Sequence, residues 1–235
     1  MYDRGWMLIN ENGEFLTQRK YAEMTFFTTK IKNGELIFFH KKTNTTARIP
    51  ILNQYGVTLR TKVWSNSCEV QKVDGIGEWF SNILGFRCYL VFLPKKNIRT
   101  KATESGIVQN VVGFADKSPV LVTHEASLQE LNHRLEVAIP MNRFRPNIVV
   151  SGGNAYEEDA WQTIKIGTTI FKTVELCGRC RMINLDQKTG ERGKEPLETL
   201  TTYRKINQQI KFGMRMSCEV EEDSYPIIRI GDEVC

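Results

Sequence analysis

The amino-acid sequence predicts a mostly β protein of the α+β class with a few packed helices, and three observations predict it. Two Asn-Gly dipeptides, Asn12-Gly13 and Asn33-Gly34, each lie between short runs rich in β-branched and aromatic residues, which is the pattern of tight hairpins. Such strand-like runs recur along the chain, whereas only three segments have helical periodicity. A closed barrel is one form that would remove the exposed edges of such sheets.

The first 70 residues are predicted to form antiparallel hairpins. The strands that flank the first Asn-Gly pair are expected at residues 6–9 and 14–17, and those that flank the second at residues 26–31 and 36–39. Asn-Gly suits these turns because both residues accept the positive φ that a two-residue hairpin requires.

Three helices are predicted. Residues 75–85 place apolar side chains at helical spacing and end on Gly85, which fits the position just past a helix. A second helix is expected from Ser127, because Ser127 and Glu130 have the spacing of a capping box and three leucines follow on one face. A third, short helix is expected over residues 195–200, with a proline in its first turn.

The polar segment 94–107 has no periodicity and is predicted to be a loop or a domain boundary. The acidic cluster 157–159 is expected to be a solvated loop. The three histidines lack the mutual spacing of a metal site, and none is assigned a role.

Composition limits the class of protein. With 235 residues, 41% of them apolar and 25% charged, the chain has the profile of a soluble globular protein. The net charge of +5 is scattered, which favours an anionic ligand weakly and nucleic acid not at all. The longest apolar run covers residues 88–93, far short of the roughly 20 residues that a membrane span needs.

The termini and the cysteines indicate the compartment. The first ten residues, MYDRGWMLIN, have the pattern of neither a signal peptide nor a transit peptide. The six cysteines do not have the spacing of a disulfide scaffold, so we expect them to be reduced and the protein to be cytoplasmic.

Two short polar segments precede apolar strands. In residues 142–147, Arg143 and Arg145 flank an aromatic residue at a strand entrance, where guanidinium groups can bind phosphate or carboxylate oxygens; a surface arginine pair explains the same pattern. In residues 116–119, a carboxylate, a cation and a hydroxyl group share one turn, which on its own indicates only a turn.

Cys177 and Cys180 form the chain's one C-x-x-C pair. A structural zinc site needs four ligands, and the remaining cysteines are isolated. A thioredoxin-like couple lies at the start of a helix, whereas this pair ends an apparent strand over residues 169–176 and precedes another strand-like stretch. Two interpretations remain: a thiolate on a β scaffold, favoured by the neighbouring arginines and suited to a transition metal, and an inert cysteine pair.

Several motifs in order give a family resemblance. They are Phe-Arg-Pro-Asn-Ile-Val-Val at 144–150, Glu-Asp-x-Trp at 158–161, Ile-Gly at 166–167, Cys-x-Arg-Cys at 177–180, Asp-x-x-Thr-Gly at 186–190 and Pro-Leu-Glu-Thr-Leu-x-x-Tyr-Arg at 196–204. In these the chain resembles the MOSC family, a β-barrel module that also forms the C-terminus of molybdenum cofactor sulfurases.

The N-terminal half carries two further motifs, Tyr-Asp-Arg-x-Trp-Met-Leu at 2–8 and Phe-Leu-Thr-Gln-Arg at 15–19. It resembles the β-barrel domain that precedes the MOSC domain in the mitochondrial amidoxime-reducing component and its bacterial relatives. The resemblance implies a smaller N-terminal antiparallel β domain over residues 1–95 and a MOSC β-barrel domain over residues 96–235.

The resemblance implies that a molybdenum cofactor, a molybdopterin that carries the metal, binds this chain. Cys180 would be the protein thiolate on molybdenum, with Cys177 a neighbour that does not bind the metal. Asp116 would lie close to the metal and handle protons. The residues implied to contact the pterin and its phosphate are Arg4, Lys117, Ser118, Arg145, Asn147, Gly178 and Arg179.

The chain departs from the family pattern at both ends. Relatives begin with another strand and a Lys-Ser segment that contributes to phosphate binding, and this sequence starts after that point. We therefore expect either a truncated start, with the first strand of the N-terminal domain missing, or a phosphate held by fewer donors. The sequence has no four-cysteine ferredoxin-like segment at its end, so electrons are expected from a separate reductase, a ferredoxin-like protein or a cytochrome b5-like protein.

The implied function is reduction of small N-hydroxylated compounds, namely amidoximes, hydroxylamines and N-hydroxylated bases. The alternative is a carrier that receives, sulfurates or delivers the cofactor without turnover of a substrate. A third hypothesis is a disulfide switch made by Cys177 and Cys180.

Overall fold

A computed structural model describes residues 3–51, 56–63, 66–94, 99–102, 109–114, 118–218 and 227–235. The chain divides into two compact units. Unit 1 comprises Met1–Thr100, Val111–Asp116 and Asp186–Glu191, and unit 2 comprises Lys101–Asn110, Lys117–Leu185 and Arg192–Cys235. No helix of the described residues is long and apolar enough to cross a membrane.

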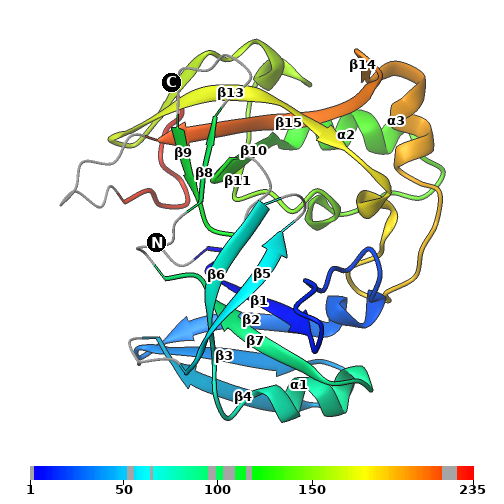
Figure 1. Ribbon diagram of the computed structural model, residues 1–235. Coiled ribbons are helices and arrows are strands. Elements are labelled where there is room, and N and C mark those ends of the chain that lie inside the picture. The colour runs from blue at the N-terminus through cyan, green and yellow to red at the C-terminus, as the bar shows by residue number, and fades with distance from the viewer. Residues whose placement is uncertain are drawn as a thin grey trace. The chain divides into compact units, whose positions relative to one another are not determined.

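Unit 1 contains two antiparallel sheets, a four-stranded one in the order β1-β7-β6-β5 and a three-stranded one in the order β2-β3-β4 (Figure 1). The strands are β1 (Trp6–Asn10), β2 (Phe27–Lys32), β3 (Glu35–His40), β4 (Thr45–Pro50), β5 (Thr58–Val63), β6 (Asn66–Lys72) and β7 (Cys88–Phe92). The helical elements are the 3-10 helix η1 (Ala22–Phe26) and the α-helix α1 (Gly77–Leu84).

The hairpin predicted around Asn33-Gly34 is confirmed. Asn33 and Gly34 both have positive φ, at 51° and 75°, and the strands pair from Lys32 opposite Glu35 onward. The prediction around Asn12-Gly13 is right for the turn, where Gly13 has a φ of 76°, but wrong for the second strand. Instead of a strand, two isolated bridges follow that turn, one between Ile9 and Phe15 and one between Glu14 and Lys62.

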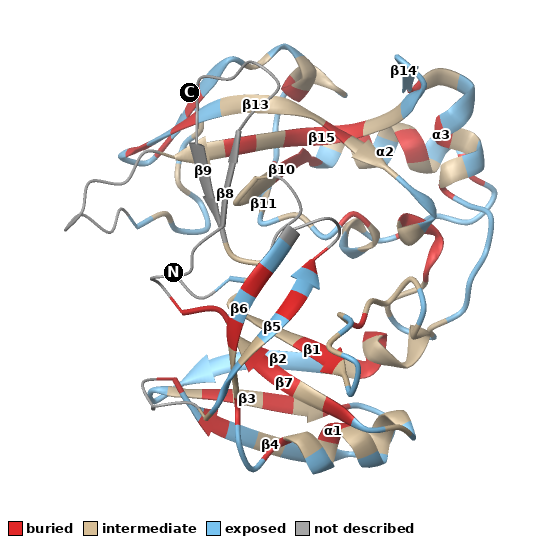
Figure 2. Cartoon of the chain, viewed as in Figure 1, coloured by how far each residue is buried: buried red, intermediate tan, exposed pale blue. Residues whose placement is uncertain are grey.

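Helix α1 and strand β3 (Glu35–His40) each bury one face. Gly85 ends α1 in the left-handed conformation, with a φ of 78°, as the sequence predicts. Phe80 is the buried residue of α1, and its ring packs on Phe27 and Phe38. Along β3 every second residue is buried (Figure 2), which is the period of a strand with one face on the core.

Unit 2 is built on one large sheet in the order β11-β10-β15-β13-β12, with β14 paired to β15. The pair β10 and β11 is parallel and the other pairs are antiparallel. The strands are β10 (Val120–His124), β11 (Ile148–Val150), β12 (Thr163–Ile166), β13 (Thr169–Arg179), β14 (Lys205–Ile206) and β15 (Gln209–Cys218). The helical elements are α2 (Glu125–Arg134), α3 (Leu197–Tyr203), η3 (Met141–Arg143), η4 (Glu157–Ala160) and η5 (Arg181–Asn184).

The fold class predicted from the sequence is confirmed: strands dominate, the described residues hold three α-helices, and the sheets curl into half-barrels. The loop predicted over residues 94–107 is wrong in part. Its residues Arg99–Ala102 form strand β8, which pairs with β9 (Gln109–Val112) in a two-stranded sheet. Strand β8 is short and polar, and it forms by pairing with a later segment. Its sequence alone therefore shows no alternation of apolar and polar residues.

The predicted capping box at Ser127 is wrong, although its helix exists. Helix α2 begins two residues earlier, and the ring nitrogen Nδ1 of His124 accepts the backbone N–H of Ala126 as the cap. Ser127 is fully buried and donates its hydroxyl to Glu158 at 2.8 Å. A carboxylate from 31 residues away along the chain therefore takes the hydroxyl that a local pattern assigns to the helix end.

The acidic cluster 157–159 is not a solvated loop, so that expectation is also wrong. Glu158 is fully buried, and burial raises the pKa of its carboxyl group above the ordinary value. Asp159 accepts two hydrogen bonds from one guanidinium nitrogen of Arg204, at 2.9 and 2.6 Å. These residues fasten η4 to the core of unit 2.

Candidate functional site

The predicted site residues of unit 2 gather where β13 ends beside β15. The pairing of these two strands is irregular at two places. Between Thr173 and Glu175 β13 holds one residue more than its partner, and between Leu176 and Gly178 β15 holds one residue more. Such bulges interrupt the hydrogen-bond ladder and redirect the side chains that follow. The course of β13 toward the cysteine pair is therefore fixed by side-chain contacts as well as by backbone pairing.

The bulge in β15 depends on Gly213. Its φ is 76°, and a Cβ atom at this position would lie 2.8 Å from both the carbonyl oxygen of Val122 and Cγ2 of Thr123. Only glycine accepts this conformation and this approach of β10 without displacement of the neighbouring backbone.

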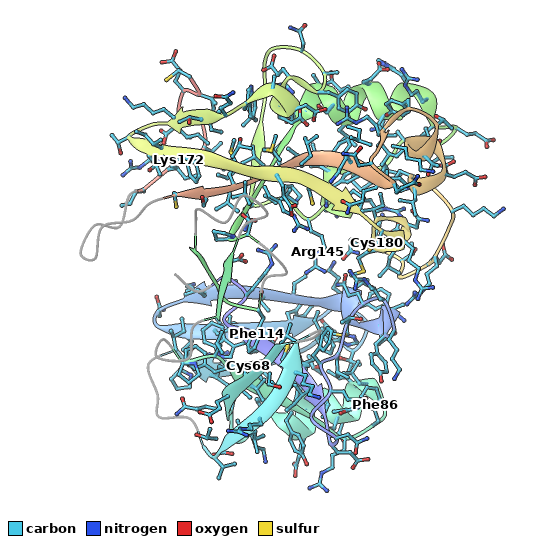
Figure 3. All side chains as sticks on the ribbon, turned by 45° about the horizontal axis from the view of Figure 1, so that its top comes forward. Cys68, Phe86, Phe114, Arg145, Lys172 and Cys180 are labelled. Atoms are coloured by element: carbon cyan, nitrogen blue, oxygen red, sulfur yellow. The ribbon has the colours of Figure 1, made fainter. Side chains whose placement is uncertain are left out.

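The two cysteines of the C-x-x-C pair have different surroundings. Cys177 is 4% exposed, and its sulfur accepts a hydrogen bond from Nε of Arg215 at 3.4 Å. Cys180 is exposed and stands where β13 ends and η5 begins (Figure 3). The strand expected after the pair is therefore wrong, since a 3-10 turn follows and leaves the thiol of Cys180 open to a ligand.

Arg179 connects β13 to the loop that precedes β11. Its Nε donates to the carbonyl oxygen of Phe212 at 2.9 Å and its Nη1 to that of Phe144 at 3.0 Å. The two phenylalanine rings stack with centroids 3.9 Å apart, which fixes the loop against β15. The second terminal nitrogen of Arg179, Nη2, is buried and has no hydrogen-bond partner within the described part of the chain.

The electrostatics of Arg179 point to an anion. Burial lowers the pKa of its guanidinium, Cys177 opposes this change, and the positive charge of Arg215 adds to it. A buried donor without an acceptor costs about 1 to 3 kcal/mol, and an anionic ligand would remove that cost. Among these groups only Glu175 is a carboxylate, and it binds Arg215 at 3.1 Å.

Two predicted residues lie in the loop that Arg179 holds. Arg145 is exposed, has a φ of 55°, and lies at the same end of the sheet as Cys180 (Figure 3). Asn147 bonds to β10: its side-chain oxygen accepts the N–H of Leu121 at 3.0 Å, and its own N–H donates to the Leu121 carbonyl at 2.8 Å. Asn147 thus continues the pairing of β10 and β11, a role that sequence reasoning did not foresee.

Ser118 and Gly178 are also placed by backbone contacts. The hydroxyl of Ser118 donates to the carbonyl oxygen of Met216 at 2.5 Å, which ties the start of β10 to β15. At Gly178 a Cβ atom would lie 2.8 Å from Oε1 of Gln209, so the absence of a side chain lets Gln209 of β15 lie against the backbone of β13.

The structure does not place the other three predicted residues in this group. Asp116 and Lys117 lie outside the described residues. Arg4 belongs to unit 1, where it pairs with Asp3 and its carbonyl oxygen accepts the N–H of Phe114 at 2.8 Å. Unit 2 by itself therefore brings together Gly178, Arg179, Cys180 and the loop of Arg145.

Sequence reasoning missed Arg215, which donates to the sulfur of Cys177, and Glu175, which accepts a hydrogen bond from Arg215. The only sign of this contact in the sequence was the presence of charged residues within two otherwise apolar strands. Which of these residues meet depends on the two bulges, and nothing local in the sequence specifies the resulting register.

Comparison with known families identifies the family of the chain. The family model described as the MOSC domain matches residues 109–235, more than half of the chain. The chain belongs to the MOSC family. The model described as the MOSC N-terminal beta barrel domain matches residues 1–87, so both parts of the MOSC arrangement are present in order.

Relatives of two kinds align with this MOSC protein. The molybdenum cofactor sulfurase of Arabidopsis thaliana is 30% identical over all of the chain, which spans only 31% of that protein's length. Mitochondrial amidoxime reducing component 2 of Rattus norvegicus is 32% identical over 99% of the chain and 72% of its own length. The Bos taurus protein of the same name is 34% identical over 86% of the chain and 62% of its own length. The name of the sulfurase connects the family to the molybdenum cofactor.

Proposed function

We propose that this MOSC protein binds a molybdenum cofactor through Cys180 and reduces N-hydroxylated compounds with electrons from a separate protein. The observation that carries the proposal is the buried Nη2 of Arg179, which has no acceptor in the described residues and lies one residue from an exposed thiol. The amidoxime reducing components that align over most of the chain supply the reaction class.

The residues of unit 2 fit such a group. A molybdopterin is anionic, and Arg179 offers it a buried cationic donor. A soft thiolate suits the metal, and the exposed thiol of Cys180 is available to it.

Each residue has a defined task in this proposal. Cys180 holds the metal, and Arg179 orients the cofactor by a charge-assisted hydrogen bond. Arg145, Ser118, Asn147 and Lys117 contribute to the binding of the pterin and its phosphate, as does Arg4.

Reduction of an N–OH group to N–H consumes two electrons and two protons and releases water. The cofactor, when bound, supplies the two-electron chemistry. Asp116 is the group that we propose for delivery of protons to the leaving oxygen, because a carboxyl group can pass protons between solvent and a substrate. The electrons come from a separate reductase, ferredoxin-like protein or cytochrome b5-like protein.

Metal analysis and an assay together test this function. The chain is produced in a host that makes molybdenum cofactor, its bound molybdenum and pterin are measured, and reduction of benzamidoxime and of a hydroxylamine is followed with reduced methyl viologen as donor. About one molybdenum per chain with turnover supports the proposal. Protein without molybdenum, from a sequence extended at its start as well as from this one, would refute it.

A second candidate function is a carrier that receives or sulfurates the cofactor. The exposed thiol of Cys180 and the alignment of the whole chain with part of a molybdenum cofactor sulfurase favour it. Stoichiometric molybdenum without reduction of any N-hydroxylated compound, together with transfer of the cofactor to an acceptor apoenzyme, would select the carrier over the reductase.

A further inference from the structure

We infer that Arg215 is a positioning residue, which holds the end of β13 in the geometry that presents Cys180. This inference rests on the proposed function for its consequence, molybdenum binding, but the contacts that carry it belong to the chain itself. Arg215 lies on β15, directly opposite Glu175 of β13. Its side chain is 16% exposed and that of Glu175 is 19% exposed.

The guanidinium of Arg215 binds two residues of β13. Its Nη1 donates to Oε1 of Glu175 at 3.1 Å, and its Nε donates to the sulfur of Cys177 at 3.4 Å. Arg215 thus binds β13 at two residues, Glu175 and Cys177, and Cys177 lies three residues before Cys180. A planar guanidinium is suited to this because its donors have fixed mutual directions.

The position of these contacts relative to the bulges gives them their importance. Glu175 is the first residue after the bulge in β13, and Cys177 lies within the irregularity between Leu176 and Gly178. The ladder is therefore interrupted on both sides of the segment that Arg215 binds. Where backbone pairing is interrupted, side-chain contacts must fix the path of the strand.

Cys177 acquires a role from this arrangement that differs from metal ligation. Its sulfur is buried and faces the guanidinium of Arg215, whereas Cys180 is exposed. Cys177 is one of two attachment points, so its loss leaves Glu175 to hold Arg215. Loss of Arg215 removes both attachments at once.

The test replaces Arg215 with leucine, which keeps apolar bulk and removes both hydrogen bonds. Lys172→Leu is the matched control, since Lys172 is an exposed cation of β13, the strand that Arg215 contacts (Figure 3). In full-length protein without cofactor, alkylation of Cys177 by iodoacetamide and amide hydrogen exchange over residues 176–180 are measured by mass spectrometry. We expect Arg215→Leu to speed both by about tenfold, because local opening governs exchange, and Lys172→Leu to leave both unchanged.

The loaded protein gives the second readout. Substitution of a residue that orients a metal ligand typically lowers metal affinity by about 10- to 100-fold. The molybdenum retained after dialysis should therefore fall by about tenfold or more in Arg215→Leu. The electron paramagnetic resonance spectrum of the residual Mo(V) should shift, since it reports the geometry of the thiolate ligand. Cys177→Ala should keep most of its molybdenum.

The outcomes separate the two proposals. Wild-type rates of alkylation and exchange in folded Arg215→Leu would overturn the positioning role, whatever the metal content. Wild-type protein without molybdenum, combined with faster alkylation and exchange in the variant, would refute the proposed function and leave the positioning role intact. If Arg215→Leu does not fold, Arg215→Lys replaces it, because lysine can pair with Glu175 but cannot bind both residues in the same fixed geometry; the same changes, smaller in size, are then expected.

Discussion

Nη1 of Arg179 donates to the carbonyl oxygen of Phe144 at 3.0 Å, and this hydrogen bond joins the end of β13, next to Cys180, to the loop that carries Arg145. The same guanidinium holds the carbonyl of Phe212 with Nε. Arg179 is therefore a structural residue through two of its nitrogens and a candidate ligand-binding residue through the third, Nη2. Substitutions at this position should change both stability and cofactor retention.

Arg179→Lys should lower both stability and bound molybdenum, whereas a substitution of an exposed arginine should lower neither. Lysine keeps the charge but cannot satisfy both carbonyl oxygens, so the free energy of unfolding should fall by about 1 to 3 kcal/mol. Bound molybdenum should fall as well, because the donor aimed at the anion is lost. Urea denaturation and metal analysis measure the two effects, and Arg192→Lys, at an exposed position of unit 2, serves as the control. Equal stability of the two variants would contradict the structural role of Arg179.

Gly213→Ala should be among the most damaging glycine substitutions in unit 2. The alanine would have to adopt a φ of 76° with its Cβ 2.8 Å from two atoms of β10. Strain of this kind costs of order 1 to 3 kcal/mol before the steric contact is counted. Gly231→Ala is the control, since its φ of 94° is similarly unfavourable but nothing lies within 4 Å. We expect urea denaturation to give a clearly larger loss for Gly213→Ala; equal losses would show that the approach of β10 does not matter.

Glu158→Gln should alter how stability depends on pH. Burial raises the pKa of Glu158 above its ordinary value of 4.5, and the hydrogen bond from Ser127 opposes this in part. The folded state therefore binds the proton more tightly than the unfolded state. The stability that the neutral carboxyl contributes is complete below pH 4.5 and is lost as the pH rises through the raised, folded pKa.

Glutamine is neutral at every pH, so the stability of Glu158→Gln relative to the wild type should increase as the pH rises through this range. Chemical denaturation at about pH 4 to 9, a range that begins just below the ordinary pKa of a glutamate carboxyl group, measures the difference. The exposed Glu125→Gln on the neighbouring helix is the control. A difference between wild type and Glu158→Gln that does not vary with pH would show that this carboxyl keeps the same pKa in the folded and unfolded chain.

The sequence was sufficient where local chemistry decides the structure. Asn33-Gly34 forms its hairpin because both residues take positive φ within the turn itself. Gly85 ends α1 for the same local reason. Ser127 shows the limit, because its hydroxyl bonds to Glu158 from a distant part of the chain rather than to its own helix. Burial and partners of this kind come from packing, which local patterns do not contain.

Some features of the candidate site could likewise be predicted from the sequence, and others could not. The Cys-x-Arg-Cys motif indicated the end of a strand, and the family resemblance distinguished Cys180 from Cys177. The structure adds a difference in burial, since the thiol of Cys180 is exposed and that of Cys177 is covered. The contacts of Arg215 required the strand register, which two bulges displace. Side chains of a strand alternate between its two faces, so each extra residue reverses which face the following side chains occupy.

The central claim is that Cys180, and not Cys177, holds molybdenum. It is tested most directly by molybdenum content per chain in Cys180→Ala and Cys177→Ala, each purified from a host that makes the cofactor and checked for an unchanged fold by circular dichroism. Wild type with about one molybdenum per chain, Cys180→Ala with almost none and Cys177→Ala close to the wild type is the expected result, because only a thiolate open to the ligand can bind the metal. Molybdenum retained in Cys180→Ala, or lost equally from both variants, would contradict the account.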